Sequence, residues 1–424
     1  VRRIGHAVYG NDMNFLSWQL PQIDAEAAWD VSLGDPNIIV AIVDDAVLLD
    51  HEDLTDQIWT NTGEIAGDSI DNDGNGYIDD VNGYDVAHDD PDANPPSNAT
   101  NQAFSHGTHV AGIAGASSDN NKGISSIGFN LSIMPVKCKI DSTINDPFLQ
   151  STYLGIDYAI VNKAHVVNMS FGSEQNNNST QYLIQAGVDS GMVFVAAAGN
   201  SGNYGVNYPA AYQDVISVAS TGFSDTKSGF STYHHTVDVS APGSVIYSTT
   251  AGTNQSYGVK SGTSMSSPLV AGLIGLMRSV DNTRDPIDYR LCLRNTADDI
   301  DPLNPDYVGW LGHGRINAQG AVACLAVATD PPVSGLSQGL ELHPIFPHPA
   351  PGRAAFSATI PHHAHMRLSL RDLRGREIAT LHEGEVDPGV FEYRFTGVPS
   401  MTTGMYLVVW EYEGEQLVQK LSWQ

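Results

Sequence analysis

The sequence contains few cysteines and little positive charge, and both shortages exclude classes of protein. Its three cysteines, Cys138, Cys292 and Cys324, are too few for a disulfide-stapled scaffold. A Cys292–Cys324 bridge with Cys138 buried in a strand is one arrangement, but the sequence leaves the pairing open. Lysine and arginine total 20 against 48 aspartates and glutamates, a formal net charge of −28. Such a surface repels phosphate groups, so we expect no nucleic-acid partner.

Long apolar runs are missing as well. No stretch approaches the roughly 18 consecutive apolar residues that span a bilayer, so we expect no transmembrane segment. The sequence begins at Val1 without an initiator Met or an apolar leader, from which we expect that a signal peptide or pro-segment was removed or left out. The 424 residues, with 41 Gly and 22 Pro, are typical of a loop-rich globular enzyme with one large and one small domain.

Short patterns typical of buried strands alternate with helical patterns. Ile38–Val43 is a continuous β-branched run of the kind found in strands buried on both faces. Similar runs recur at Leu131–Val136, Val166–Met169, Val193–Ala198 and Val215–Val218, and helical patterns such as Ser151–Lys163 and Gln181–Ser190 separate them. The alternation predicts an α/β fold with a doubly wound, mostly parallel sheet and helices on both faces.

One serine stands at the start of a predicted buried helix. Ser264 lies in the segment Gly262–Gly272, whose apolar character continues to Met277. We expect Gly262 to allow a sharp backbone turn and Pro268 to lie near the first helical turn, where its missing N–H costs nothing. Free N–H groups there favour negative charge beside the serine. In isolation the segment is equally typical of a helix cap, because a hydroxyl needs a base to become a nucleophile.

Three other polar side chains occupy comparable positions. Asp44 directly follows the first predicted strand, Asn200 follows the fourth, and His106 opens a helix rich in small residues. Open α/β sheets place their sites at the carboxyl ends of parallel strands, so we expect these residues to meet Ser264 at one edge. A carboxylate, an imidazole, a hydroxyl and an amide are together sufficient for acyl transfer.

Over roughly residues 15–328 the sequence resembles the subtilisin-like serine proteases. Six motifs carry the resemblance in order, namely Val40–Asp44, His106–Gly112, Asn168–Gly172, Ala196–Asn200, Ser240–Gly243 and Gly262–Pro268. The chain order Asp, His, Ser is that of subtilisin itself. The resemblance implies a subtilisin-like fold and a monomeric serine endopeptidase that hydrolyses protein or peptide substrates through an acyl-enzyme intermediate.

The same resemblance implies roles for individual residues. It implies that Asp44 orients His106, while His106 takes the proton of Ser264 and returns it to the leaving amine. The amide Nδ2 of Asn200 and the Ser264 backbone N–H are implied to form the oxyanion hole. The implied substrate-binding residues are Ser170, Phe171 and Gly172, which pair with the substrate backbone as an added strand, and Ala197, Ala198 and Gly199, which border the primary specificity pocket.

Two residues depart from the family pattern. After the catalytic aspartate the family usually has Ser or Thr and then Gly, whereas this chain has Asp45 and Ala46. We expect Asp45 to perturb the titration of Asp44 by like-charge repulsion, and the Cβ of Ala46 to strain the turn. The kexin-like branch of the family also carries Asp-Asp here. The departure motivates an alternative function, a catalytically impaired subtilase-like binding protein.

The segment Asp71–Asn82 has the spacing of a calcium-binding loop. Its expected ligands are Asp71, Asp73, Asn75 and Asp79 through side chains and Tyr77 through its carbonyl, with Gly76 at the sharp turn of an EF-hand-like loop. Asn82 replaces the bidentate Glu at the last position, which predicts a lower affinity. We expect a structural Ca²⁺ here, and the alternative is a solvated Asp/Asn/Gly turn.

The last part of the sequence predicts a second domain. We interpret residues 1–328 as the peptidase domain, 329–340 as a linker and 341–424 as a β-sandwich of six or seven short strands. Four segments resemble the C-terminal sorting domain of the type IX secretion system: Phe346–Gly352, with His348 in place of the usual Asn, Asp372–Arg376, Gly404–Val408 and Gln419–Leu421. This resemblance implies a secretion-machinery partner and a secreted or surface-attached protein. An ordinary carbohydrate- or protein-binding sandwich, or a surface-adhesion module, is the alternative.

Overall fold

The computed structural model divides the chain into two compact units, Val1–Asp330 and Pro331–Gln424. It describes residues 12, 17–97, 99, 103–143, 146, 148–327, 340–342, 345, 354–372, 375–398, 401–413 and 415–423. Except for Leu340, the predicted linker lies outside the described residues, and so does the segment Phe346–Gly352. Among the described residues, no helix has the length and apolar character that crossing a bilayer requires.

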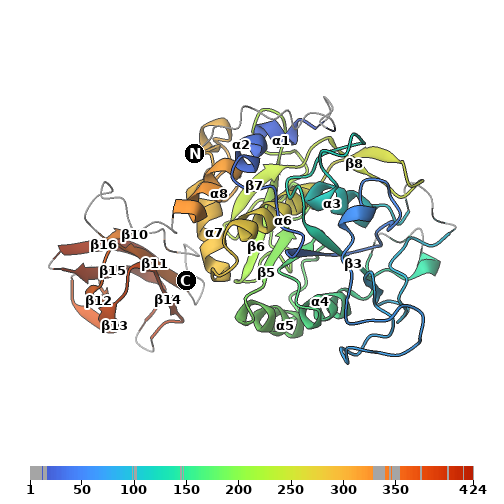
Figure 1. Cartoon of the computed structure of the whole chain (residues 1–424). Coiled ribbons are helices and arrows are strands. Elements are labelled where there is room, and N and C mark those ends of the chain that lie inside the picture. The colour runs from blue at the N-terminus through green and yellow to red at the C-terminus, as the bar shows by residue number, and fades with distance from the viewer. Residues whose placement is uncertain are drawn as a thin grey trace. The chain divides into compact units, whose positions relative to one another are not determined.

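A seven-stranded sheet forms the centre of the first unit (Figure 1), in the order β2-β3-β1-β4-β5-β6-β7. Its strands are β1 (Ile39–Asp44), β2 (Tyr84–Asp85), β3 (Ser132–Lys137), β4 (Val166–Met169), β5 (Val193–Ala197), β6 (Val215–Thr221) and β7 (Val239–Pro242). All neighbouring strands pair in parallel. The strand order changes direction beside β1, which pairs with β3 on one side and β4 on the other. Doubly wound sheets bind ligands outside the carboxyl ends of strands at such a point.

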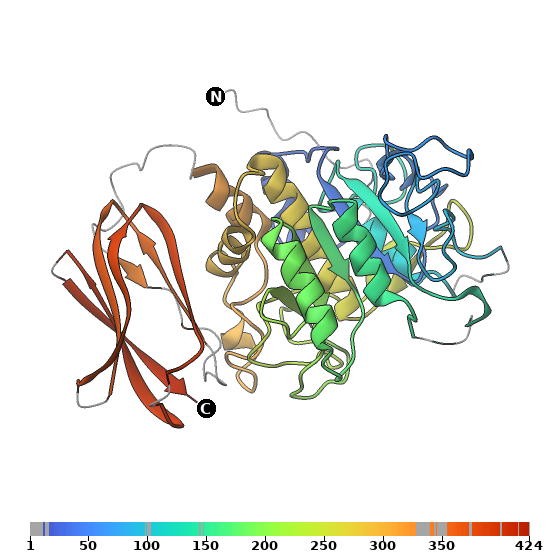
Figure 2. The ribbon, with the colours of Figure 1, turned by 90° about the horizontal axis from the view of Figure 1, so that it is seen from below.

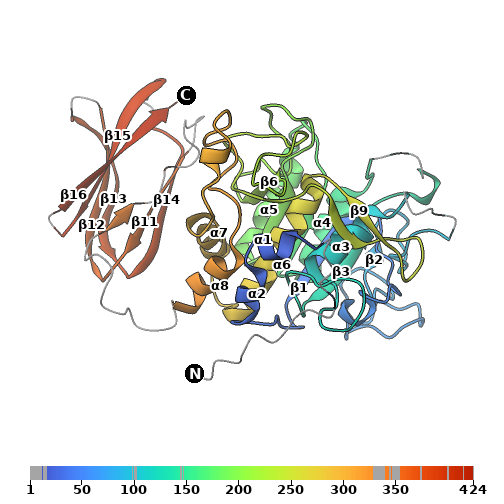
Figure 3. The same cartoon turned by 90° about the horizontal axis from the view of Figure 1, so that it is seen from above.

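Helices cover both faces of this sheet. Helices α4 (Thr152–Val161) and α5 (Asn178–Asp189) lie on the face turned to the viewer in Figure 2, and α3 (His106–Gly115) and α6 (Thr263–Val280) lie on the face seen in Figure 3. Alternation along β1 serves both faces, because Val40 and Ile42 pack in one buried cluster and Ala41 and Val43 in another. The predicted doubly wound α/β fold is therefore confirmed.

Shorter elements complete the first unit. They are α1 (Gln19–Gln22), α2 (Ala25–Trp29), α7 (Pro286–Asn295), α8 (Ala318–Val327), the antiparallel pair β8 (Ile246–Thr249) and β9 (Tyr257–Lys260), and short 3₁₀ turns at Thr55–Gln57, Asp141–Thr143 and Asp301–Leu303. A disulfide between Cys292 and Cys324 joins α7 to α8, while Cys138 is free and buried. The pairing that the sequence left open is thus the one between these two helices.

The second unit is all-β, as predicted. One antiparallel sheet contains β10 (Glu341–Leu342), β11 (Ala354–Ile360) and β14 (Gly389–Phe395), and the other contains β13 (Glu377–Val386), β12 (Ala364–Arg371), β15 (Gly404–Tyr412) and β16 (Glu415–Trp423). Residues from both sheets form one buried cluster, in which Phe356, Leu368 and Trp410 are fully buried. The unit therefore has a hydrophobic core of its own.

Candidate active site

Strand β1 ends at Asp44 and helix α3 begins at His106, and the two side chains meet there. The distance from His106 Nδ1 to Asp44 Oδ1 is 2.7 Å, and Asp44 is 1% exposed. Burial acts to lower the pKa of His106, but the charge and hydrogen bond of Asp44 outweigh burial and leave the pKa raised. When Nδ1–H donates to Asp44, the other ring nitrogen, Nε2, is left to accept a proton.

The neighbouring Asp45 bonds to the backbone of the same helix. Its carboxylate accepts hydrogen bonds from the N–H groups of His106 at 3.1 Å, Gly107 at 2.7 Å and Ala46 at 2.8 Å. Burial, followed by the charge of Asp44, raises the pKa of Asp45. Ala46 is not among the residues with positive φ, so the expected strain at this position is wrong.

Helix α6 places Ser264 as its second residue, next to the end of β4. Ser264 Oγ donates to the Ser170 carbonyl at 3.1 Å, and Ser170 Oγ donates to the Ser264 carbonyl at 2.9 Å. Pro268 explains the second bond, because it lacks the N–H that would bond to the carbonyl four residues before it. Pro268 is the sixth residue of α6, just beyond the first turn, so the expectation that its missing N–H costs nothing is wrong. The freed carbonyl receives its hydrogen bond from Ser170 instead.

A buried polar chain extends this contact, and sequence reasoning missed two of its members. Asn168 Nδ2 donates to Ser170 Oγ at 2.9 Å, and Ser267 Oγ donates to Asn168 Oδ1 at 2.7 Å. Asn168 and Ser267 are both fully buried. The sequence feature that could have identified them is their polarity at positions where the strand and helix patterns predict apolar side chains. These bonds fix α6 against β4.

The amide of Asn200 is oriented by the residue that begins α6. Asn200 Oδ1 accepts hydrogen bonds from the Thr263 backbone N–H at 2.9 Å and the Thr263 hydroxyl at 3.0 Å. A backbone N–H only donates, so the bonded atom is the amide oxygen and Nδ2 remains for another acceptor. Gly262 is almost extended, at φ 160° and ψ 161°, so the expected sharp turn is wrong. A Cβ at Gly262 would instead lie 3.5 Å from Nδ2 and cover one side of that donor.

Ser264 lines two cavities. One, of about 300 Å³, is lined by five of the six predicted substrate-binding residues, Ser170, Phe171, Gly172, Ala197 and Gly199, together with Asn200. The other, of about 990 Å³, is lined by Asp44, His106 and the segment 170–173. The remaining predicted residue, Ala198, does not line either cavity and packs in a buried cluster with Ala219 and Val237.

Comparisons with known proteins agree with this geometry. A model of the subtilase family matches residues 35–320. The chain belongs to the subtilase family. It is 37% identical over 314 residues to thermitase of Thermoactinomyces vulgaris, across 74% of this chain and 98% of thermitase. It is 32% identical to the minor extracellular protease Epr of Bacillus subtilis (strain 168), across 74% of this chain and 43% of that protein.

A solved structure supports the same conclusion. Proteases from Pseudoalteromonas arctica PAMC 21717 match with a TM-score of 0.60 at 25% identity, across 74% of this chain and 99% of that one. The subtilase is therefore a serine endopeptidase that hydrolyses peptide bonds, and the alternative of a binding or adhesion protein is not favoured.

One group of acids in this subtilase includes part of the predicted calcium loop. One carboxylate oxygen each from Glu64, Asp71 and Asp73 lies within 4.8 Å of the other two. Sequence spacing did not find Glu64, because it precedes the loop. The carboxylate of Asp79 lies elsewhere, where it accepts hydrogen bonds from three backbone N–H groups of residues 67–69. Asn75 Oδ1 accepts from the Tyr77 backbone N–H at 2.7 Å.

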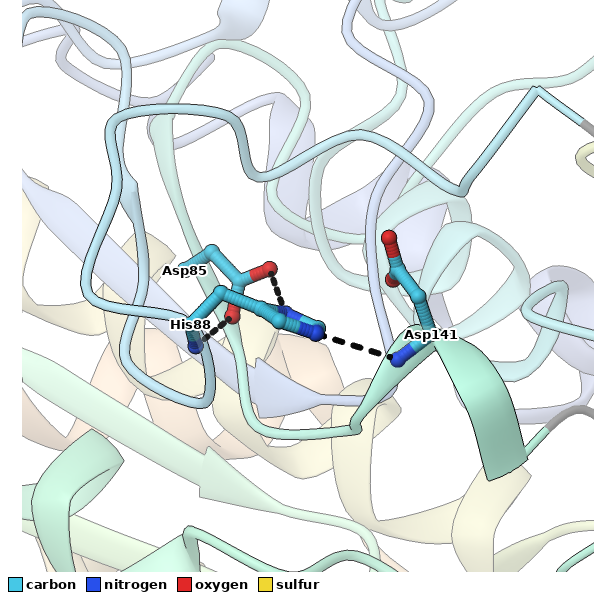
Figure 4. Close-up of side chains that lie close together, drawn as sticks. All are labelled: Asp85, His88 and Asp141. Carbon is cyan, nitrogen blue, oxygen red and sulfur yellow. Dashed lines mark hydrogen bonds and ion pairs between the residues drawn. The ribbon is translucent and has the colours of Figure 1, made fainter.

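A second group, Asp85, His88 and Asp141, has metal-like spacing (Figure 4). It is already bonded to a cation, the ammonium of Lys137. His88 Nδ1 lies 2.8 Å from Asp85, and Lys137 Nζ lies 2.7 Å from Asp85 and 2.8 Å from Asp141. Burial acts to lower the pKa of Lys137, but its hydrogen bonds to Asp141 and Asp85 leave the pKa raised. The ammonium bonds to both carboxylates that a metal ion would use, so this group is an ion-pair network.

We predict that Lys137→Met destabilises the protein by about 3–5 kcal/mol, because it leaves the buried carboxylate of Asp85 without its cation. Lys122→Met is the matched control, since Lys122 is exposed, and its effect should stay within about 0.5 kcal/mol. Chemical denaturation with and without added Zn²⁺ measures both. If Lys137→Met leaves the free energy of unfolding unchanged and added Zn²⁺ raises it, the group is a metal site instead.

Proposed function

We propose that this subtilase is a secreted serine endopeptidase in which Asp44, His106, Ser264 and Asn200 perform the chemistry. The observation that supports the proposal most directly is the 2.7 Å contact of His106 with Asp44 beside the cavity that Ser264 also lines. Thr263 donates two hydrogen bonds to Asn200 Oδ1. These bonds orient the amide, so that Nδ2 is a donor with a defined direction at the same site.

In the proposed reaction, His106 Nε2 takes the proton of Ser264 Oγ as the oxygen attacks the substrate carbonyl. Asp44 stabilises the imidazolium that forms. Asn200 Nδ2 and the Ser264 backbone N–H donate to the oxyanion of the tetrahedral intermediate. His106 then returns the proton to the leaving amine as the C–N bond breaks, and a water molecule deprotonated by His106 hydrolyses the acyl-enzyme.

Substrate binding is proposed to use the edge of β4. In this structure Ser264 Oγ donates to the Ser170 carbonyl, so attack requires the hydroxyl to rotate toward His106. That rotation frees the Ser170 carbonyl for a backbone N–H of a substrate that adds as a strand along Ser170–Gly172. The side chain before the cleaved bond would enter the 300 Å³ cavity bordered by Ala197 and Gly199.

We further propose that Glu64, Asp71 and Asp73 hold a structural Ca²⁺, with Asn75 and the Tyr77 carbonyl as further ligands. Hard oxygen ligands suit this ion. In the described part of the chain, none of the three acids forms an ion pair with a Lys, Arg or His, in contrast to the group around Lys137. Glu64 supplies the carboxylate that the loop lacks at Asn82. The Asp79 carboxylate, bonded to the 67–69 backbone, lies outside this group of three, and we propose that it holds the loop in shape.

Secretion is proposed on separate grounds. The relative Epr is named as extracellular, and the Cys292–Cys324 disulfide suits an oxidising compartment. We propose that residues 1–328 form the peptidase domain and that residues 341–424 form a type IX sorting domain that engages the secretion machinery. Its separate hydrophobic core supports independent folding. We propose a monomer, secreted or attached at the cell surface.

The catalytic assignment predicts that Ser264→Ala and His106→Ala abolish peptide hydrolysis, because nucleophile and base act as one unit. Asn200→Ala should fold normally and lose roughly a hundred- to a thousandfold in kcat, the loss found for the corresponding donor of subtilisin. Asn254→Ala, at an exposed position outside the site, is the control. Near-normal turnover of Asn200→Ala, or failure of a serine-directed covalent probe to label Ser264, contradicts the assignment.

The calcium proposal predicts a change in stability rather than in chemistry. With a dissociation constant on the order of 10⁻⁴ M, a hundredfold excess of Ca²⁺ should add about 2.7 kcal/mol to the free energy of unfolding. Thermal unfolding in a Ser264→Ala background, with Ca²⁺ or with chelator, measures this without autolysis. Asp73→Ala and Glu64→Gln should both remove the response to Ca²⁺, whereas Asp79→Asn should retain it. An identical melting temperature in both conditions would mean that the loop is a solvated turn.

The domain proposal predicts that a chain truncated at about Thr329 keeps the kcat/KM of the full chain, because the sandwich has its own core. The truncated chain should remain inside the producing cell, while the full chain is exported. Activity per active site, titrated with the serine-directed probe, corrects for the amount of folded protein. A large loss of specific activity in soluble truncated protein would make residues 341–424 part of the enzyme.

A further inference from the structure

The helix that begins with His106 lacks a cap from its own flanking residue. Helix α3 has ten residues, and the side chain of Ser105, which precedes it, makes no capping hydrogen bond. The first N–H groups of a helix have no partner within the helix and need one from outside. Here that partner is Asp45, whose two carboxylate oxygens accept from the N–H groups of His106 and Gly107.

The sequence makes this distant cap possible through Gly107. A Cβ on Gly107 would lie 2.4 Å from the Ala46 carbonyl oxygen and 2.8 Å from the Asp44 Cβ. Only a residue without a side chain therefore allows the first turn of α3 to lie directly on the end of β1. The close approach brings both carboxylates of the Asp44–Asp45 pair to His106, one to its ring and one to its backbone.

We propose that Asp45 is a positioning residue, which caps α3 from the end of β1 so that the His106 ring is held against Asp44 and its imidazolium gains a second nearby negative charge. This inference rests on the proposed role of His106 as the catalytic base. Asp45 acts through His106 and needs no contact with the substrate. Asp45, which motivated the alternative of a catalytically impaired protein, thus helps to position the base His106.

The charged groups that act on His106 come from two elements. Asp44 and Asp45, at the end of β1, favour the protonated ring, while Lys260, on β9, disfavours it. Burial also disfavours the charged ring. Removing the charge of Asp45 should lower the pKa of His106. Because the protonated ring is the inactive base, the acid limb of the kcat/KM profile should then move to lower pH.

Three variants separate the cap from the charge. Asp45→Asn and Asp45→Ser remove the charge but keep an oxygen that can cap the helix, and Asp45→Ala removes both. We expect all three to shift the acid limb down by on the order of one pH unit. Asp45→Asn and Asp45→Ser should keep kcat within a few-fold of the unmodified enzyme at the pH optimum. Asp45→Ala should lower kcat roughly ten- to a hundredfold with little change in KM, because a small displacement of the His106 ring slows the reaction.

The matched control is Asp50→Asn, which removes an exposed carboxylate six residues after Asp44 and should leave the acid limb unchanged. Melting temperatures identify variants that fail to fold. If Asp45→Ala fails to fold, Asp45→Ser still tests the proposal. Equal losses in all three variants without a shifted acid limb overturn the proposal in favour of a purely structural acid. A rise in KM restricted to substrates with basic side chains overturns it in favour of a substrate contact. Activity retained in His106→Ala would instead refute the proposed catalytic assignment itself.

Discussion

Pro268 cannot donate a hydrogen bond to the carbonyl of Ser264, and the active edge of the sheet is arranged around that gap. The freed carbonyl accepts from Ser170 Oγ, which in turn accepts from Asn168. Ser267 returns the chain of bonds to the helix. Buried polar groups must be paired, so α6 has one satisfactory position along β4. The interruption of the helix is therefore what fixes the position of Ser264 relative to the end of the sheet.

A second constraint joins the helices that begin with His106 and Thr263. They come into contact where a Cβ on Gly272 would lie 2.5 Å from the Ala114 carbonyl oxygen. Small residues at this crossing let α3 and α6 lie on the same face of the sheet with their first turns at its active edge. Neither helix could shift along the other without opening the buried cluster between them. The separation of base and nucleophile is thus a property of the core.

Patterns in the sequence predicted those features that depend on local chemistry. Continuous β-branched runs predicted the buried parallel strands, because such strands have no solvated face. Asn200 was predicted from its place after a strand. Glu64, however, joins Asp71 through the folding of a loop, and no spacing rule covers that meeting. Ala198 differs from Ala197 in the direction of its side chain, which the pleat and local twist of the backbone decide.

Because acidic residues far outnumber basic ones, each buried carboxylate needs its own means of stabilising its charge. Asp45 is stabilised by backbone N–H groups, and the buried Asp85 by an ammonium. Asp238 is fully buried between two arginines; burial acts to raise its pKa, but Arg290 and Arg294 outweigh burial and leave the pKa lowered. Carboxylates brought close together repel one another, and bonds to cations or to N–H donors offset that repulsion. A chain with 48 acidic and 20 basic side chains cannot supply a cation to every carboxylate, so some acids accept backbone N–H groups instead, as Glu64 does from Asn72, Asp73 and Asp79.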